Sequence, residues 1–305
     1  FYPYREDFPT LRDLEPGLKV DSTNAQVVSS VLPAELLKYL SAGDFAFTIQ
    51  QTTDFPTRQA TVDATLAHHQ GVVVGREELQ NYVAGRPFPV LDTNDPDAGL
   101  KAMWNHRYRD QGDVVETRAT MDLVNGNGAV ERSQDFSIAW VFGMHRPDPE
   151  KNVSQWERNR VFAKRTMLVL APSDIEGMQV LDTFWDNASI PLNEWVYDPK
   201  TRRTRKLAYN PYISPDRGVM LIEDQNGFMG YIGAYDWKYL GKQTVLAPGP
   251  IHTPESTYGG KGGWYFVDPW ELRRALVVEG TPMASHPLYS RRVLYLDQQT
   301  YLPLV

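Results

Sequence analysis

Histidines come first in a search for chemistry, because an imidazole can bind a metal ion or carry a proton near neutral pH. The chain has six histidines and no cysteine, so thiolate ligands and a cysteine nucleophile are excluded. His68 and His69 are adjacent, and on a strand they would point to opposite faces. The other four histidines are isolated in sequence and lack the spacing of a two-histidine metal motif: His106, His145, His252 and His286. We therefore expect no metal site and no cofactor.

Other motifs that could carry chemistry are incomplete. No G-x-S-x-G turn is present, which argues against a serine hydrolase of the α/β type. The glycine-rich residues 258–264 imitate a phosphate-binding loop, but they neither follow a clear strand nor open a helix. The acidic turn at residues 92–97 has Asp97 and Met103 where a calcium loop needs glycine and glutamate. The sequence therefore predicts a protein that is not an enzyme.

A basic cluster follows the tight turn at residues 198–201. Along a strand, Arg203 and Arg205 would share one face, and Lys206 would lie on the other. The cluster is either a charged, solvated hairpin or a contact for an anion, such as a lipid headgroup or an acidic partner surface. In the second interpretation these three residues make the anion or partner contact.

Large apolar residues recur at every second position of residues 136–142, so they share one face of a strand. This face is either plain hydrophobic core or the lining of a cavity. A curved sheet with a wide apolar concave side must be filled by a helix, a ligand or both. In the cavity interpretation, the expected lining residues are Met121, Phe136, Ile138, Trp140, Phe142 and Trp195.

Period-two alternation of this kind continues through most of the chain and indicates antiparallel strands. The Asn-Gly-Asn-Gly run at residues 125–128 predicts a hairpin, since both residue types tolerate the positive φ that such turns need. Further strands are expected at residues 163–170, 178–185, 195–197, 204–207, 235–246, 272–278, 290–296 and 300–305.

Helices are expected at residues 30–40 and 98–108, each with apolar residues on one face. Helical crossovers between strands are missing, so the fold class should be mainly β (α+β), a meander of antiparallel strands. Residues 1–305 are expected to form a single domain with an extended N-terminal segment at about residues 1–29.

Composition sets further limits on function. The 305 residues are 42% hydrophobic and 23% charged, the balance of a soluble globular protein. No apolar run approaches the roughly 20 residues of a membrane helix, so the chain is not expected to span a bilayer. A net charge of −7 argues against nucleic acid as a partner. The first residues lack the basic head and apolar core of a signal peptide, so such a peptide either was removed or never existed.

Several separated stretches together resemble a proteobacterial family, the domain of unknown function thirteen-twenty-nine, often titled outer-membrane lipoprotein-sorting protein. The Trp-Val-Tyr-Asp-Pro stretch at residues 195–199, followed by paired arginines, is typical of it. The family's usual N-terminal T-I-P-x-W motif is not visible here. The matching stretches are residues 81–89, 102–109, 195–205, 235–242, 275–280 and 289–297.

This resemblance implies a fold like that of the lipoprotein carriers LolA and LolB. Such a fold is a strongly curved antiparallel half-barrel, with helices closing its concave face over an apolar cavity for acyl chains. Members of the family are exported to the periplasm and often occur beside genes for RND-type transporters and outer-membrane proteins. No catalytic residue is established for the family, so none is carried over.

Two functions stay open at this point. The first is a periplasmic carrier or binding protein for a lipid or other hydrophobic molecule, serving an envelope transport system, with or without association to the outer membrane. The alternative is a structural or adaptor subunit of a cell-envelope assembly that binds a protein partner. The aromatic residues at 258–266 motivate this alternative, because interfaces are enriched in tyrosine, tryptophan and phenylalanine.

Overall fold

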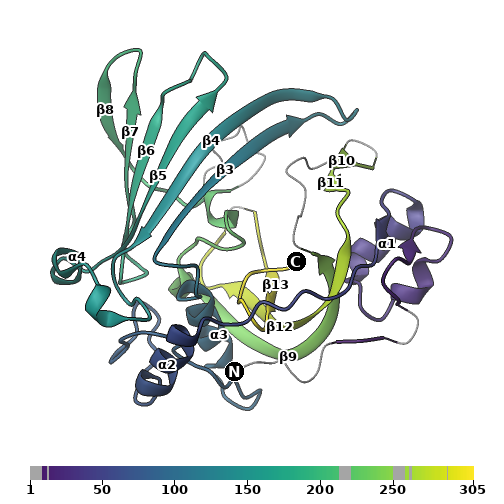
Figure 1. Cartoon of the computed structure of the whole chain (residues 1–305), viewed down its shortest axis with the longest axis horizontal. Coiled ribbons are helices and arrows are strands. Elements are labelled where there is room, and N and C mark those ends of the chain that lie inside the picture. The colour runs from purple at the N-terminus through teal and green to yellow at the C-terminus, as the bar shows by residue number, and fades with distance from the viewer. Residues whose placement is uncertain (1–8, 12–13, 213–220, 250–257, 261–262, 287) are drawn as a thin grey trace.

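The computed structural model describes residues 9–11, 14–212, 221–249, 258–260, 263–286 and 288–305. Within these residues, two antiparallel sheets hold most of the regular structure, one of six strands and one of three. Figure 1 shows the six-stranded sheet rising on one side of the molecule and the three-stranded sheet curving below it. The two sheets diverge from a shared helical base.

The six-stranded sheet is a simple meander, in which each strand pairs with the next one along the chain. Its first hairpin turns at residues 125–128, where Gly128 has a φ of 84° and donates its N–H to the Asn125 carbonyl at 2.9 Å. The predicted Asn-Gly hairpin is therefore confirmed. The strands in order are β3 (Val114–Val124), β4 (Val130–Phe142), β5 (Val161–Ala171), β6 (Gln179–Trp185), β7 (Asn193–Asp198) and β8 (Arg203–Leu207).

The three-stranded sheet has the order β13–β12–β9, and its strands are long and strongly bent. The pairing of β12 with β9 shifts between Val277 and Val278, opposite Gly241, which has a φ of 107°. Such a bulge bends a strand and favours glycine, because a side chain would be strained at this φ. The bounds of these strands are β9 (Tyr235–Pro248), β12 (Trp270–Pro282) and β13 (Arg292–Asp297).

Helix α3 (Ala98–Arg107) lies against β9 and joins residues of both sheets into one hydrophobic cluster. Gly99 permits this close approach, because a Cβ atom there would collide with the backbone of Trp237. Trp104 is fully buried and donates its indole N–H to the Gly75 carbonyl at 2.8 Å. The helix predicted at residues 98–108 is confirmed.

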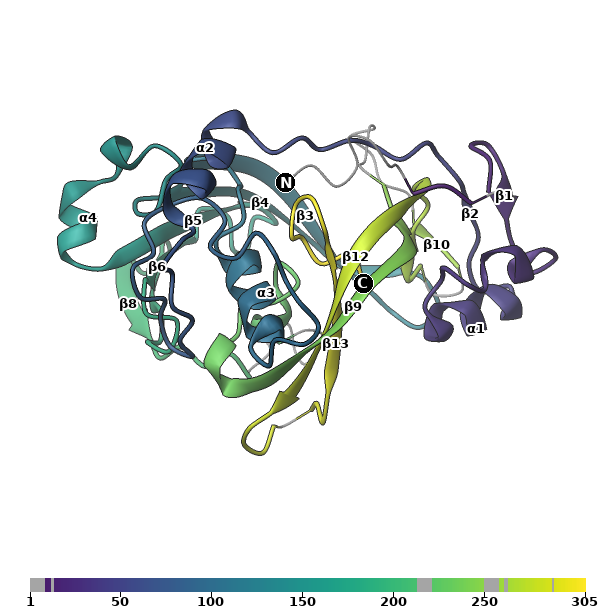
Figure 2. The same cartoon turned by 90° about the horizontal axis from the view of Figure 1, so that it is seen from below.

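Figure 2 shows α1 (Ala34–Ala42) and α4 (Ser154–Arg158) toward opposite ends of the molecule, whereas α2 (Gln59–His68) lies near α3. α1 confirms the helix predicted at residues 30–40 and ends at Gly43, whose φ of 79° is left-handed. α2 and α4 were not predicted, since α2 has its apolar residues spread around the helix and α4 is short. The short elements are β1 (Lys19–Val20), η1 (Ala25–Val28), β2 (Phe47–Thr48), η2 (Pro149–Lys151), η3 (Ile222–Asp224), η4 (Ile232–Ala234), β10 (Tyr258–Gly259) and β11 (Tyr265–Phe266).

Of the extended chain expected at about residues 1–29, residues 1–8 and 12–13 lie outside the described part, and residues 14–29 are more folded than expected. β1 pairs with β2, and η1 buries Ala25 and Val28. These side chains join a second hydrophobic cluster with Trp270 and Leu272 of β12. The N-terminal region is therefore held by the far end of the three-stranded sheet.

Taken together, the described residues form a mainly antiparallel β fold with few helices. The sheets are curved but do not close into a barrel, so the predicted half-barrel class is confirmed. The curvature is divided between two sheets. Among the helices of the described residues, α3 covers one end of the concave space and leaves the rest of the inner face of the six-stranded sheet without a helix on it.

Candidate functional site

The inner face of the six-stranded sheet carries the predicted apolar row. Directly opposed residues of antiparallel strands point to the same side. The register pairs Ile138 with Met167, and Met121 with Gln134, which lies two residues from Phe136. The predicted shared face is confirmed for five residues, while their role in binding stays a prediction: Met121, Phe136, Ile138, Trp140 and Phe142.

At one end of this row, aromatic side chains pack into the main hydrophobic cluster. Trp140 stacks on Phe184, with ring centroids 4.9 Å apart, and lies parallel to Phe142 at 5.9 Å. The guanidinium of Arg165 covers the Trp140 ring at 5.2 Å and pairs with Asp182 at 2.6 Å. This end of the row is hydrophobic core.

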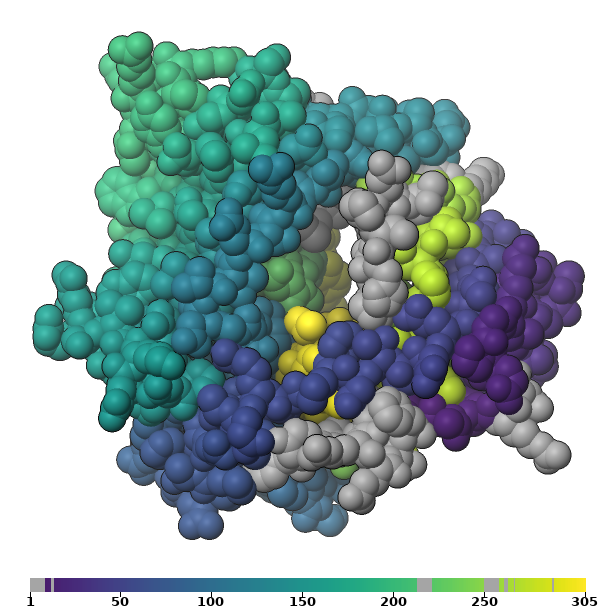
Figure 3. Space-filling model, in the orientation of Figure 1, coloured from purple at the N-terminus to yellow at the C-terminus, as the bar shows by residue number. Residues whose placement is uncertain are grey.

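Beyond Trp140, the row continues as apolar residues that belong to neither hydrophobic cluster of the described residues. The register places Val180 beside Met167, and Val196 beside Val180. Figure 3 shows the molecule hollowed next to this sheet. We call the following partly buried residues the inner strip: Met121, Ile138, Met167, Val180 and Val196.

The prediction that Trp195 lines the same face is wrong. The register pairs Trp195 with Leu181 of β6 and Lys206 of β8, on the side opposite to Val196. Trp195 and Leu181 are 41% and 42% exposed. Alternation within a strand shows which residues share a face, but only pairing with β6 shows which face of β7 is the inner one.

The basic cluster lies on β8, an edge strand of the sheet. Arg205 opposes Val196 and Arg203 opposes Asp198, so both arginines share the face of the inner strip. Lys206 lies on the outer face beside Trp195. All three basic residues are exposed, and within the described part of the chain none forms an ion pair.

A small cavity lies where the inner face meets α3. It holds about 80 Å³ and is lined by Trp140 and Phe142 of β4 and by His106, Arg107 and Arg109 of α3 and its end. Ligand pockets are typically about 300 Å³ or larger. This cavity is much smaller, and no residue of the inner strip lines it.

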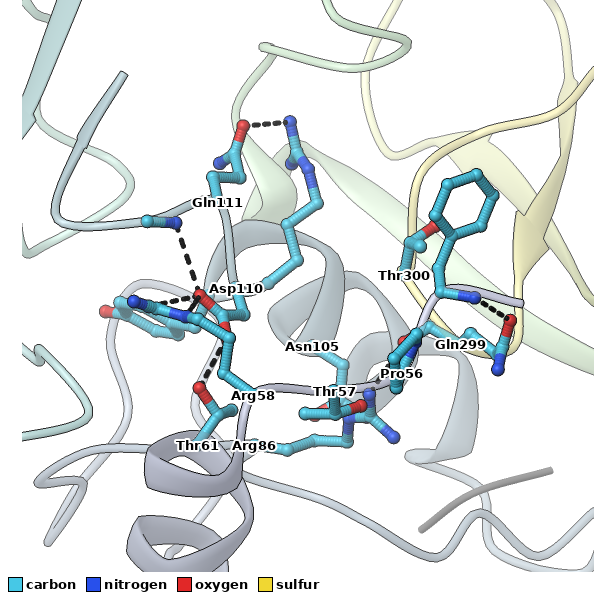
Figure 4. A pocket seen from close by; sticks show the side chains of 14 residues that line it. Pro56, Thr57, Arg58, Thr61, Arg86, Asn105, Asp110, Gln111, Gln299 and Thr300 are labelled. Atoms are coloured by element: carbon cyan, nitrogen blue, oxygen red, sulfur yellow. Dashed lines mark hydrogen bonds and ion pairs between the residues drawn. The ribbon is translucent and has the colours of Figure 1, made fainter. Parts of the chain in front are cut away.

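A larger cavity of about 390 Å³ lies next to it, between the start of α2, the end of α3 and the turn at residues 299–300. Figure 4 shows Arg58 pointing toward Asp110 and Thr61 on one side, with Gln299 on the other. The Nε atom of Arg58 donates to the two Asp110 carboxylate oxygens at 2.8 and 3.0 Å. The charged side chains that line this cavity are Arg58, Arg86, Arg109 and Asp110.

Arg109 and Gln111 line both cavities and thus form the wall between them. Arg109 donates from Nη1 to the His106 carbonyl at 2.8 Å and from Nη2 to Gln111 Oε1 at 3.1 Å. Its Nε atom is buried without a hydrogen-bond partner in the described structure, and no described carboxylate pairs with it. Burial therefore lowers the pKa of Arg109 to about 10.

His106 is fully buried on the same helix. With its proton on Nδ1, the ring donates to the Tyr301 carbonyl at 2.8 Å, while Nε2 lies 3.3 Å from the Phe228 carbonyl. Burial and the positive charge of Arg109 lower the pKa of His106 to about 3. The ring is therefore neutral near pH 7, and its single N–H ties α3 to the distant Tyr301 carbonyl.

Asp186 is the centre of a buried charged cluster beside the base of the sheet. It accepts a hydrogen bond from Tyr108 Oη at 2.9 Å and lies 2.8 Å from His145 Nε2 and from Arg160. Burial would raise the pKa of Asp186, but these three partners together lower it to about 2. A carboxylate with so many donors acts as a structural anchor rather than as a general base.

A second buried cluster surrounds Glu223, which is fully buried. It accepts hydrogen bonds from Tyr235 at 3.1 Å, from His286 Nε2 at 2.7 Å and from Arg292 at 2.5 Å. The backbone N–H of Tyr289 donates to His286 Nδ1 at 2.9 Å, so the proton of this ring is on Nε2. In the described residues, no group of three or more His, Asp or Glu side chains is arranged to hold a metal ion.

A known family matches nearly the whole chain. The profile of DUF1329, described as a protein of unknown function, matches residues 19–305. The chain belongs to the DUF1329 family. This result confirms the resemblance seen in the sequence motifs. No curated protein matches the chain in sequence.

Solved structures similar to this DUF1329 chain include a DUF1329 family protein from Desulfovibrio piger. It is 18% identical, with a TM-score of 0.46 over 69% of this chain and 72% of that one. A putative outer membrane lipoprotein-sorting protein domain from Vibrio parahaemolyticus is 18% identical, with a TM-score of 0.43 over 69% and 71%. A LolA superfamily protein from Nitrosomonas europaea is 12% identical, with a TM-score of 0.35 over 68% of each chain.

Two features of this DUF1329 chain bear on its site. In the part of the chain that the structure describes, no helix combines the length and the hydrophobicity needed to cross a bilayer.

The 390 Å³ cavity was not predicted from the sequence, because its walls come from residues 55–61, 86, 105–112 and 299–300. The one local sign of this cavity in the sequence is the run of closely spaced basic residues at 106–109, which is part of a stretch that resembles the family.

Proposed function

We propose that this protein binds and carries a lipid or another hydrophobic molecule for an envelope transport system. The single observation that carries the proposal is the inner strip, an apolar row on a concave sheet face that belongs to neither hydrophobic core. Exposed apolar surface of this kind costs free energy in water, and an apolar ligand laid against it removes that cost. The predicted lining residues on this face are Met121, Phe136, Ile138, Trp140 and Phe142.

The free energy expected for binding an apolar chain to the inner strip suits a carrier protein. Each buried methylene contributes about 0.8 kcal/mol, so a chain of about ten methylenes gains about 8 kcal/mol, which corresponds to roughly micromolar affinity. Because the strip is open rather than enclosed, a ligand can enter and leave without the sheet unfolding. That combination favours reversible transfer over permanent storage.

The protein is proposed to act in the periplasm, with an RND-type transporter or an outer-membrane protein as the partner that delivers or receives the ligand. No catalytic role is proposed, because the buried titratable clusters at Asp186 and Glu223 are satisfied by their own neighbours. The exposed arginines at 203 and 205 border the strip and are proposed as its anion or partner contact, with Lys206 on the outer face of the same strand.

Two adjacent residues of β6 give a matched test of the strip. Val180 faces inward and Leu181 faces outward, where it is 42% exposed. A carboxylate at position 180 would lie between Met167 and Val196, so Val180→Glu should weaken binding of the neutral dye N-phenyl-1-naphthylamine by about tenfold or more. Leu181→Glu adds the same charge on the other face and should leave dye affinity unchanged. Equal affinities in both variants, measured by fluorescence titration, would refute binding on this face.

A second candidate is an adaptor that binds a protein partner, and an exposed aromatic group supports it. Tyr39 and Trp264 are 51% and 44% exposed, and their ring centroids lie 5.3 Å apart. Aromatic side chains of this kind often anchor interfaces. If this function holds, Tyr39→Ser together with Trp264→Ser should abolish co-purification of an envelope protein while dye binding stays intact.

A further inference from the structure

Arg109 lies at the boundary between a polar cavity and an apolar sheet face, since it lines both the 390 Å³ cavity and the 80 Å³ cavity beside Trp140. We propose that this boundary is a head-group site, at which Arg109 and Arg86 hold the oxyanion of an amphipathic ligand whose tail runs over the inner face of the sheet. This inference rests on the proposed function and narrows its ligand to acidic amphiphiles, such as a fatty acid.

The charges in the larger cavity are the first argument. Arg58 is neutralised by Asp110 and lies 3.7 Å from Asp113. Arg86 and Arg109 also line the cavity, but neither pairs with a carboxylate among the described residues. The cavity therefore carries uncompensated positive charge in a chain whose net charge is −7.

The contacts of the two arginines leave donors for a ligand. Arg86 donates from Nη2 to the Gln299 carbonyl at 2.9 Å, and its guanidinium stacks on the Tyr301 ring at 4.6 Å. Arg109 donates from Nη1 to one backbone carbonyl and from Nη2 to Gln111, which leaves a second hydrogen on each of these nitrogens for a ligand. Both arginines are partly buried. A partly buried cation without a counter-charge is costly, and an oxyanion would offset that cost by accepting charge-assisted hydrogen bonds.

The arrangement of the cavities is the second argument. Arg109 and Gln111 are shared by both cavities, and the smaller one is lined by Trp140 and Phe142. Figure 4 shows Gln111 and Arg86 on opposite sides of the larger cavity, which holds about 390 Å³. The tail of a ligand whose head lies at Arg109 would pass Phe142 and Trp140, beside the Arg165 guanidinium that covers Trp140, and would then reach the inner strip. A free inorganic anion would make no use of this path.

The test compares two ligands that differ only in the head group, dodecanoate and dodecanol, by isothermal titration below their aggregation concentrations. The wild-type protein should bind dodecanoate about 30-fold more tightly than dodecanol, as expected for hydrogen bonds to a charged partner. Arg109→Met should abolish this preference while leaving dodecanol affinity unchanged. Arg118→Gln, which removes one exposed positive charge from the outer face of β3, should retain the preference.

The outcomes separate this inference from the proposed function. If dodecanol binds but dodecanoate shows no advantage, or if Arg109→Met keeps the advantage, the head-group site is refuted and the carrier function stands. If neither ligand binds, the carrier function fails and this inference fails with it. Butanoate has the head group and almost no tail, so binding as tight as that of dodecanoate would overturn the tail path in favour of a free-anion site. Dodecyl phosphate distinguishes a phosphate from a carboxylate head.

A second variant guards against misfolding. Arg86→Gln alters a more peripheral donor and should reduce the preference for dodecanoate by about threefold to tenfold. Near-ultraviolet circular dichroism of each variant should match the wild-type spectrum. Loss of preference in Arg109→Met with an intact spectrum supports the site, whereas full preference in both variants overturns it.

Discussion

The two sheets of this protein are both antiparallel and curved, yet they use their inner faces differently. The three-stranded sheet is covered by α3 around Val278 and Leu296 and by the N-terminal region around Leu246, and all three residues are fully buried. The six-stranded sheet enters the core only at its base, around Trp140, and leaves the inner strip partly buried. The same local pattern of alternation therefore builds a stable core in one place and an available surface in another. What differs is whether a helix lies on the face.

The largest expected effect on the free energy of unfolding comes from removing the Trp104 side chain of α3, which packs against the covered sheet. Trp104 is fully buried and hydrogen-bonded to the Gly75 carbonyl. Trp104→Ala should lower the free energy of unfolding by about 4 kcal/mol, measured by urea denaturation, because it leaves a large cavity and an unpaired carbonyl. A loss below about 1 kcal/mol would show that α3 does not hold the core together.

The second expected effect is a pH dependence of the free energy of unfolding, which arises from His106 in the covered region. The pKa of His106 is about 3 in the folded protein, against 6.5 in a model peptide. The unfolded chain therefore binds a proton that the folded protein excludes, and stability that is present above pH 6.5 is lost as the pH falls toward 3. This group alone should reduce the free energy of unfolding by about 3 kcal/mol between about pH 7 and pH 4.5.

His106→Gln isolates this contribution. The variant should be less stable than the wild type near neutral pH, but its stability should decline less between about pH 7 and pH 4.5. His69→Gln replaces a histidine at the end of α2 and should keep the wild-type slope. Parallel stability profiles for His106→Gln and the wild type would contradict a buried neutral imidazole.

The third effect should be smaller, because it concerns the uncovered face. Ile138 is only partly buried and lies outside both hydrophobic clusters. Ile138→Ala should therefore cost about 1 kcal/mol, well below the 2–5 kcal/mol of a fully buried isoleucine. Leu296→Ala on the covered sheet is the matched control and should cost about 3 kcal/mol. If the two variants lose equal stability in urea, the two faces do not differ as described.

The smallest effect on stability concerns the basic edge strand. Reversing the charges with Arg203→Glu and Arg205→Glu should change the free energy of unfolding by no more than about 0.5 kcal/mol, because both side chains are exposed. If these arginines contact an anion, the double variant should weaken binding of an anionic ligand more at low salt than at high salt. Titrations of dodecanoate at two ionic strengths measure this, and equal affinities throughout would leave the cluster as solvated surface.

The sequence predicted those features that depend on neighbouring residues. Alternation placed Phe136 and Trp140 on one face, and the Asn-Gly run at 125–128 located the hairpin, because both signals are local. Trp195 was assigned to the wrong face, since the orientation of β7 is set by its pairing with β6. The separation into two sheets likewise depends on which strands pair, and no local pattern encodes that choice.

The cavity at Arg109 was even less predictable from local sequence patterns than the orientation of β7. Its walls come from the start of α2, the end of α3 and a turn about 190 residues further along the chain. The lack of a counter-charge for Arg109 is a property of how these segments are assembled. No spacing rule in a single sequence reports an arginine that finds no carboxylate after folding.

The position of β8 at the edge of its sheet has one more consequence. An edge strand offers unpaired backbone N–H and C=O groups, which can recruit the edge of another molecule and start fibrillar aggregation. On β8, positive charges stand on both faces, from Arg203 and Arg205 on one and Lys206 on the other. Two copies that met along this edge would bring like charges together on both sides. The charges of the basic hairpin should therefore oppose self-assembly along this edge.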